Sequence, residues 1–234
     1  MSLIVKICGL STPEALDVAL EAGADMVGFV FFPASPRHIG FEAAKLLGAR
    51  AASRALKVAL TVDAANDMLR DIVDALKPDL LQLHGRETPE RVGAIRLRFG
   101  LPVMKAIPIA ARADLSPVRL YATTADHMLF DARAPREATR PGGLGKPFDW
   151  RLLQNLDVGI PFMLSGGLDA GNVAEALQMT RAPGVDVSSG VERVPGQKDP
   201  EKICAFVRAA RQAAERLAAT PPRPAAARSR RGRG

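Results

Sequence analysis

The chain alternates short apolar runs with longer amphipathic segments. The short runs are rich in β-branched and aromatic residues, which is typical of buried strands, and the segments between them repeat apolar residues every three to four positions, which is typical of helices. The runs occupy residues 4–8, 26–31, 57–62, 80–83, 103–107, 128–130, 162–164 and 185–187. About eight strands, each followed by a helical segment, predict an α/β fold with a single (β/α)8 TIM barrel.

Residues typical of helix starts support this division. Thr12 precedes Pro13 and Asp199 precedes Pro200, and a capping side chain before a Pro at the first helical position is typical of a helix N-terminus. The fifth unit differs, because Pro117 falls in the middle of its helical segment. Proline removes a backbone donor and clashes with the preceding turn, so a short or broken helix is predicted there.

The chain divides into a long body and a short basic tail. Its 234 residues are enough for one buried core, and we expect one catalytic barrel domain over residues 1–219. Residues 220–234 lack apolar periodicity and predict a disordered tail. Five arginines lie in this tail, and without them the formal net charge falls by five, from +7 to +2. Nucleic-acid binding through the tail is an alternative, but no aromatic residue is present there to stack on bases, so we expect no nucleic-acid partner.

The remaining composition indicates a cytoplasmic protein. Cys8 and Cys204 lie far apart in the sequence, and the first six residues lack the pattern of a signal peptide. Charged residues or glycine interrupt every apolar stretch before it reaches the roughly 18 residues that cross a bilayer. We therefore expect a reducing compartment and no membrane partner.

Polar residues recur at the predicted strand ends. Residues two apart share a face of a strand, and the outer face of a barrel packs against helices, so Val5 and Ile7 are expected to face outward. The same parity turns a set of mostly polar residues inward: Lys6, Cys8, Thr61, Asp63, Gln82, His84, Leu129, Asp131, Asp186 and Ser188. One such residue is more often structural, but several together favour an active site at the C-terminal end of the barrel.

Two glycine-containing turns follow the last two strands. Residues 165–168 read Ser-Gly-Gly-Leu, and residues 188–190 read Ser-Ser-Gly. Phosphate sites in this fold are frequently built by these two loops, because glycine lets backbone N–H groups approach an anion. Either turn alone is explained by a tight connection that needs positive φ. The pair favours a phosphorylated substrate, and neither turn matches the glycine patterns of nicotinamide or ATP sites.

Cys8 and Asp131 are the candidates for proton transfer. Cys8 ends the first strand on the same face as Lys6, whose ammonium is expected to lower the thiol pKa. Cys204 falls in an apolar helical pattern and is interpreted as a buried apolar residue. Asp131 ends the sixth strand, where burial favours a protonated carboxyl able to donate its proton. The 3 histidines lie in different units, so we expect no metal.

Taken together, these motifs resemble those of the phosphoribosylanthranilate isomerase family. They follow the family's order, and the resemblance covers residues 3 to 217. The motifs are KICGL at 6–10, SPR at 35–37, QLHG at 82–85, Asp131, GGLGK at 142–146, SGGL at 165–168 and DVSSGVE at 186–192. Leu144 departs from the family pattern, which has a small polar residue, often Thr, at this place. The glycines of its loop suggest a mobile cover over the substrate.

The resemblance implies a reaction that needs no cofactor. This is the Amadori rearrangement of N-(5′-phosphoribosyl)anthranilate to 1-(o-carboxyphenylamino)-1-deoxyribulose 5-phosphate in tryptophan biosynthesis. Asp131 matches the general acid that protonates the furanose oxygen, and Cys8 matches the general base that removes the proton from C2′. Arg37 matches the residue near the anthranilate carboxylate. The implied substrate-binding set is Arg37, Gly166, Gly167, Leu168, Asp186, Ser188, Ser189 and Gly190.

Other phosphate-binding barrels are the nearest alternatives. The tryptophan synthase α subunit and the histidine-pathway aminoaldose isomerase share the terminal phosphate loops but are not expected to carry a cysteine at Cys8, where the latter would have aspartate. An RNA-binding protein acting through the arginine-rich tail is the alternative from another class. We expect a monomer, with a homodimer as the alternative.

Overall fold

The computed structural model describes residues 2–135, 137–138, 142, 145 and 147–219. The predicted tail at 220–234, Leu144 and most of the predicted cover loop at 142–146 lie outside the described residues.

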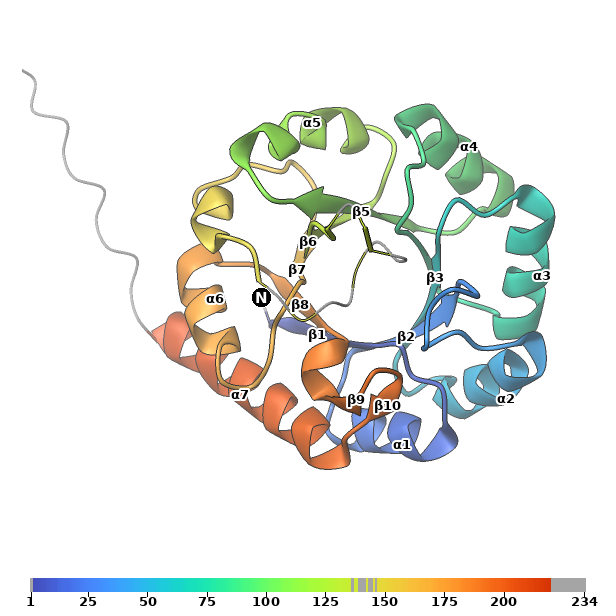
Figure 1. Ribbon diagram of the computed structural model, residues 1–234, viewed down its shortest axis with the longest axis horizontal. Coiled ribbons are helices and arrows are strands. Elements are labelled where there is room, and N and C mark those ends of the chain that lie inside the picture. Colours follow the sequence, from blue (N-terminus) through green and yellow to red (C-terminus); the bar gives the residue numbers. More distant parts are fainter. Residues whose placement is uncertain (1, 136, 139–141, 143–144, 146, 220–234) are drawn as a thin grey trace, which may run out of the picture.

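Eight parallel strands close into a barrel in sequence order, with β1 paired to β8, and the helices form a ring outside them (Figure 1). This confirms the predicted TIM barrel, and the strand bounds differ from the predicted ones by one or two residues at most. The strands are β1 Ile4–Cys8, β2 Met26–Phe31, β3 Leu56–Thr61, β4 Leu80–Leu83, β5 Val103–Ile109, β6 His127–Ala132, β7 Phe162–Leu164 and β8 Gly184–Val187.

Helices follow most strands, as predicted. The Thr12 side chain accepts a hydrogen bond from Ala15 N and so caps the first helix. After β5, Pro117 separates a 3₁₀ turn from a helix of one turn, and after β6 the described residues form only a 3₁₀ helix. The helices are α1 Pro13–Glu21, α2 Phe41–Ala51, α3 Asn66–Leu76, α4 Pro89–Phe99, η1 Arg112–Leu115, α5 Val118–Tyr121, η2 Trp150–Leu153, α6 Val173–Thr180, η3 Ser189–Val191 and α7 Pro200–Ala219.

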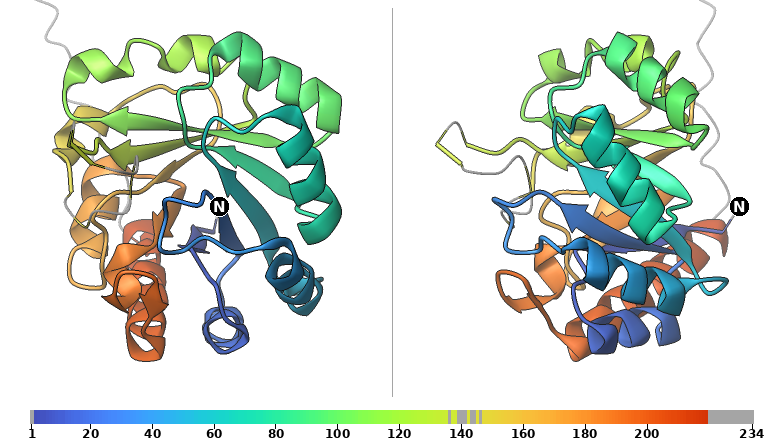
Figure 2. Two further views of the ribbon diagram at one scale, coloured as in Figure 1. Left: turned by 45° about the vertical axis from the view of Figure 1, so that its right-hand side comes forward. Right: turned by 90° about the vertical axis from the view of Figure 1, so that its right-hand side faces the viewer.

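A short antiparallel hairpin interrupts the βα repeat after β8. It consists of β9 (Glu192–Val194) and β10 (Gln197–Lys198), and no sequence pattern predicted it. The hairpin lies at the end of the barrel opposite the N-terminus, which is the end where the strands terminate (Figure 2, right). Its turn carries Gly196 at φ 87°, and a Cβ there would lie 2.5 Å from the carbonyl oxygen of Pro36. The hairpin therefore packs closely on the loop after β2.

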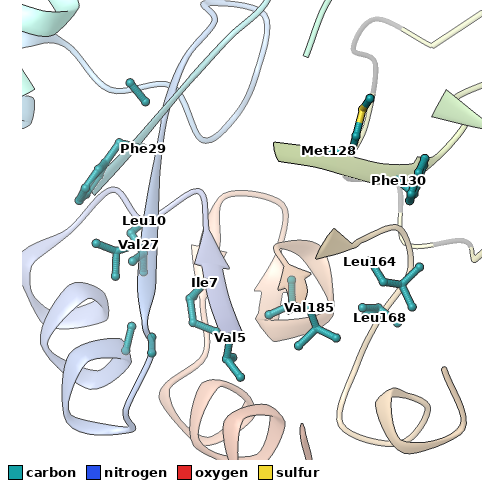
Figure 3. Packing of buried hydrophobic residues seen from close by; sticks show 14 of the residues in the cluster. Val5, Ile7, Leu10, Val27, Phe29, Met128, Phe130, Leu164, Leu168 and Val185 are labelled. Carbon is teal, nitrogen blue, oxygen red and sulfur yellow. The ribbon is translucent and has the colours of Figure 1, made fainter. Parts of the chain in front are cut away.

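The apolar core has two layers. The outer layer fills the space between strands and helices and includes Val5, Ile7, Val27 and Phe29, part of which Figure 3 shows. The second cluster comes from alternate positions of the same strands and fills the lower interior of the barrel: Met26, Val58, Leu80, Met104, Ala106, Leu129 and Met163. Above it lie a small apolar cluster of Cys8, Val30 and Leu60 and the polar side chains of the site.

The inward orientation predicted for Thr61 and Asp63 is wrong. Leu60 is the Cα partner of Gln82 in the β3–β4 register, and paired residues of parallel strands share a face. Leu60 and Val62 accordingly line the interior pocket. Thr61 is buried on the outer face, and Asp63 lies in the following turn at φ 49°. The small Thr61 hydroxyl is buried between strand and helix, so its polarity did not indicate the direction in which the side chain faces.

We predict opposite stability effects for two helical glycines. Gly→Ala inside a helix ordinarily stabilises by about 0.5–1 kcal/mol, because it restricts the unfolded chain. A Cβ at Gly93 of α4 meets no atom nearer than Thr124 at 3.7 Å, so Gly93→Ala should stabilise. A Cβ at Gly48 of α2 would lie 2.6 Å from the carbonyl oxygen of Leu76, so Gly48→Ala should destabilise. Urea unfolding measures both, and a stabilised Gly48→Ala would contradict the close α2–α3 contact.

Candidate active site

A pocket lies at the C-terminal end of the strands. All the predicted site residues line this pocket except Gly190. The lining residues are Cys8, Val30, Phe32, Ser35, Arg37, Leu60, Val62, His84, Asp131, Gly142, Ser165, Gly166, Gly167, Leu168, Asp186, Val187, Ser188 and Ser189.

A buried ion pair forms the floor of the pocket. Lys6 Nζ lies 2.7 Å from Asp186 Oδ1, and neither side chain is more than 5% exposed. The hydroxyl of Ser165 donates to Asp186 Oδ2 at 3.1 Å. Burial lowers the pKa of Lys6, but the Asp186 carboxylate outweighs it and holds the pKa above its ordinary value. Lys6 is therefore a permanent cation at the base of the site.

Cys8 lies directly above this pair, and its thiol is not activated as predicted. Burial raises the pKa of the Cys8 thiol above its ordinary value, and Asp186 adds to the rise, although Lys6 and Lys198 oppose it. The prediction of a lowered pKa failed because burial of the thiol disfavours the charged thiolate more than the Lys6 ammonium favours it. Cys8 is therefore a thiol of raised pKa that lies close to two cations.

Asp131 approaches from β6, separated from β1 by β7 and β8. Its Oδ2 lies 3.1 Å from His84 Nε2, and its Oδ1 accepts the backbone N–H of Ala132. The Gln82 amide nitrogen lies 3.1 Å from His84 Nδ1. Because an amide nitrogen can only donate, Nδ1 accepts and Nε2–H donates to Asp131. His84, which had no predicted role, thus orients the carboxyl of Asp131.

The loops after β7 and β8 meet at one wall of the pocket. Gly166 and Gly167 have φ of 86° and 68°, and a Cβ at Gly190 would lie 1.9 Å from the carbonyl oxygen of Leu168. No hydrogen bond within the described part of the chain uses the backbone N–H groups of Gly167, Leu168, Ser189 or Gly190. Unpaired N–H groups from two converging glycine loops are suited to binding an anion such as phosphate.

Arg37 lines the pocket close to Ser188 and is held by a residue that the sequence analysis missed. Its Nε and Nη2 each donate to Glu192 at 2.7 Å, and both side chains are buried. Lys198 Nζ lies 2.8 Å from Glu192 Oε1. Burial raises the pKa of Glu192, yet these two cations outweigh it and lower the pKa. Glu192 lay within a recognised motif, but nothing in its spacing indicated a partner 155 positions away.

Three further observations concern Cys204, groups of potential metal ligands and membrane-spanning helices. Cys204 is free and only half-buried, so its interpretation as a fully buried residue is wrong. Among the described residues, no three His, Cys, Asp or Glu side chains gather as metal ligands would. None of the described helices has the length and apolar character needed to cross a membrane.

Known proteins resemble this chain along most of its length. A family model described as N-(5′-phosphoribosyl)anthranilate (PRA) isomerase matches residues 5–209. The N-(5′-phosphoribosyl)anthranilate isomerase of Rhodopseudomonas palustris (strain BisB5) is 65% identical over 215 residues, covering 92% of this chain and 99% of the relative. That of Bradyrhizobium diazoefficiens is 66% identical over 211 residues, covering 90% and 95%.

Solved structures also resemble this chain along most of its length. The crystal structure of phosphoribosyl anthranilate isomerase from Thermotoga maritima has a TM-score of 0.81 and 33% identity, covering 90% of this chain and 99% of that one. A phosphoribosyl anthranilate isomerase in complex with reduced 1-(o-carboxyphenylamino)-1-deoxyribulose 5-phosphate has a TM-score of 0.76 and 30% identity, with the same coverage.

We predict that Asp186→Asn moves the reactivity of Cys8 to lower pH. Asp186 raises the pKa of the Cys8 thiol, and removing its charge also leaves Lys6 to favour the thiolate, the reactive form. The rate of iodoacetamide alkylation, followed by mass spectrometry against pH, measures this shift, with Cys204 as internal reference. Asp149→Asn, which removes an exposed carboxylate, should leave the profile unchanged. An unchanged Asp186→Asn profile would contradict the assigned coupling.

Proposed function

The chain belongs to the N-(5′-phosphoribosyl)anthranilate isomerase family, and we propose that Cys8 and Asp131 are the general base and general acid of its reaction. The reaction is the isomerisation of N-(5′-phosphoribosyl)anthranilate in tryptophan biosynthesis. The observation that carries the proposed roles is the placement of a thiol and a carboxyl in one pocket, on strands β1 and β6.

The proposed chemistry proceeds in three steps. Asp131 protonates the furanose ring oxygen, and the ring opens to a Schiff base at C1′. The Cys8 thiolate then removes the proton from C2′, and the electron pair moves toward the nitrogen to give an enolamine. The enolamine tautomerises to the ketone as the C2′ hydroxyl loses its proton and C1′ gains one. No net proton or electron is consumed, as an isomerisation requires.

The two charged groups of the substrate are assigned to different parts of the pocket lining. The phosphate is placed on the N–H groups of the β7 and β8 loops that no hydrogen bond among the described residues uses, with Asp186 supporting the floor. The anthranilate carboxylate is placed against Arg37, which lines the pocket from the loop after β2. A planar guanidinium suits a carboxylate, and glycine-loop amides suit a phosphate, so the opposite assignment would match the chemistry less well.

We also propose a monomer that works in a reducing compartment. The exposed large apolar side chains are spread over different elements, for example Leu46 on α2, Leu97 on α4 and Leu120 on α5, which is typical of a free surface. The related Thermotoga maritima protein is described as dimeric, with generated monomers, so both states occur in similar chains. A reducing compartment keeps the Cys8 thiol available.

We predict that Cys8→Ala and Asp131→Asn each lower turnover by about 10²–10⁴-fold with the fold intact, because each removes a proton-transfer group. The decay of phosphoribosylanthranilate fluorescence measures turnover, and circular dichroism checks the fold. Cys204→Ser is the matched control for Cys8, since Cys204 lies outside the pocket, and should retain wild-type turnover. Near-normal turnover in folded Cys8→Ala would contradict the assigned base.

We predict that Gly190→Ala raises KM for phosphoribosylanthranilate by about tenfold or more and weakens inhibition by inorganic phosphate. The added Cβ would lie 1.9 Å from the carbonyl oxygen of Leu168, so the two phosphate loops must separate. A loss of one charge-assisted contact of about 1.5–3 kcal/mol corresponds to this change. Gly40→Ala, where a Cβ meets no atom within 4 Å, is the control. Equal phosphate inhibition in both variants would count against the phosphate assignment.

A further inference from the structure

The β9–β10 hairpin supplies two buried charges next to Arg37, and neither transfers a proton in the proposed reaction. Glu192 begins β9 and Lys198 ends β10. Their side chains are 3% and 1% exposed. Burying two charged groups costs free energy unless they are paired. We therefore expect the burial of Glu192 and Lys198 to serve more than the fold of a two-stranded hairpin.

Glu192 fixes the guanidinium of Arg37 in one orientation. Both carboxylate oxygens are used, Oε1 by Nε and Oε2 by Nη2, each at 2.7 Å. Two parallel hydrogen bonds define the plane of the guanidinium as well as its position. Arg37 belongs to the loop between β2 and α2, so without this contact its long side chain would have several accessible rotamers.

Lys198 holds Glu192 and connects it to the phosphate side of the pocket. Its ammonium donates to Glu192 Oε1 at 2.8 Å, to the carbonyl oxygen of Ser188 at 2.9 Å and to the hydroxyl of Ser188 at 3.2 Å. The backbone N–H of Gly196 donates to Glu192 Oε2 at 3.3 Å. One continuous chain of contacts therefore runs from Arg37 through the hairpin to the loop after β8.

The charges of Arg37, Glu192 and Lys198 favour an anionic ligand. Arg37 and Lys198 share the carboxylate of Glu192, while the neighbouring Asp186 is paired with Lys6. Burial lowers the pKa of Lys198 even though Glu192 opposes the shift, and Arg37 adds to the lowering. A buried group of two cations and one carboxylate gains from a further negative charge.

We propose that Glu192, anchored by Lys198, is a positioning residue that presents the guanidinium of Arg37 to the ortho-carboxylate of the substrate's aromatic amine. The hairpin is thus the element that selects a carboxylated aromatic amine over an uncharged one. This inference rests on the proposed function, in which Arg37 faces the anthranilate group.

The test compares two ligands that differ only in the carboxylate. They are reduced 1-(o-carboxyphenylamino)-1-deoxyribulose 5-phosphate and its analogue without the carboxyl group, with Kd measured by titration calorimetry. The wild type should bind the carboxylated ligand about tenfold to a hundredfold more tightly, the range of one charge-assisted contact. In Glu192→Gln this preference should fall by about tenfold, with Kd for the analogue within about twofold of wild type. KM for phosphoribosylanthranilate should rise in parallel while kcat changes little.

Two further variants show whether Glu192 acts through Arg37. Arg37→Ala should lose the preference, and adding Glu192→Gln to it should bring no further loss, because coupled residues are non-additive. Glu42→Gln removes an exposed carboxylate paired with Lys45 and is the matched control, which should behave as wild type. Should Glu192→Gln fail to fold, Lys198→Gln removes the anchor of Glu192 together with the two contacts to Ser188, and it should reduce the preference about threefold to tenfold.

The outcomes distinguish a failure of the positioning role of Glu192 from a failure of the proposed placement of the carboxylate at Arg37. Equal weakening of both ligands in Glu192→Gln, or an unchanged preference, would overturn the positioning role and leave the isomerase function standing. A wild type that binds both ligands equally would overturn the placement of the carboxylate at Arg37, and the inference with it.

Discussion

The buried pair of Lys6 and Asp186 is the constraint on which the site depends. An ammonium inside a barrel costs several kcal/mol unless a carboxylate meets it, and Asp186 lies on the last strand, 180 positions away. The two residues are Cα partners in the β1–β8 register, so the pair exists only when the barrel is closed. Closure of the barrel therefore positions the Lys6–Asp186 pair at the floor of the pocket. Above it lie Cys8 and Ser188, each two residues further along these strands.

The site divides its charges between two halves. The β1 and β8 half holds Lys6, Asp186 and Cys8, and the β4 and β6 half holds His84 and Asp131. Each half is connected by its own hydrogen bonds, and none links the two among the described residues. An acid and a base so close to a shared substrate must not neutralise each other, and separate partners on separate strands keep their protons apart.

The sequence predicted what periodicity and local chemistry determine, which is the barrel, its strand ends and the two glycine loops. It misplaced Thr61, because a barrel strand is apolar on both faces and polarity alone does not report direction. It misjudged the pKa of Cys8, because proximity to Lys6 was visible in the sequence but the burial of the thiol, which outweighs the effect of Lys6, was not. Glu192 and Lys198 were missed because their roles depend on contacts between distant segments.

The charges of the substrate have consequences for the base. Lys6 and Lys198 lower the pKa of the Cys8 thiol, while any unpaired anion nearby raises it. A phosphate and a carboxylate brought into this pocket would therefore make the thiolate harder to form unless their charges were met locally. Loop amides and Arg37 would meet these charges before they act on Cys8. Lys6 and Lys198, although paired with Asp186 and Glu192, would then still lower the pKa of the thiol, which makes the binding of both charged groups a condition for the proposed base catalysis as well as for affinity.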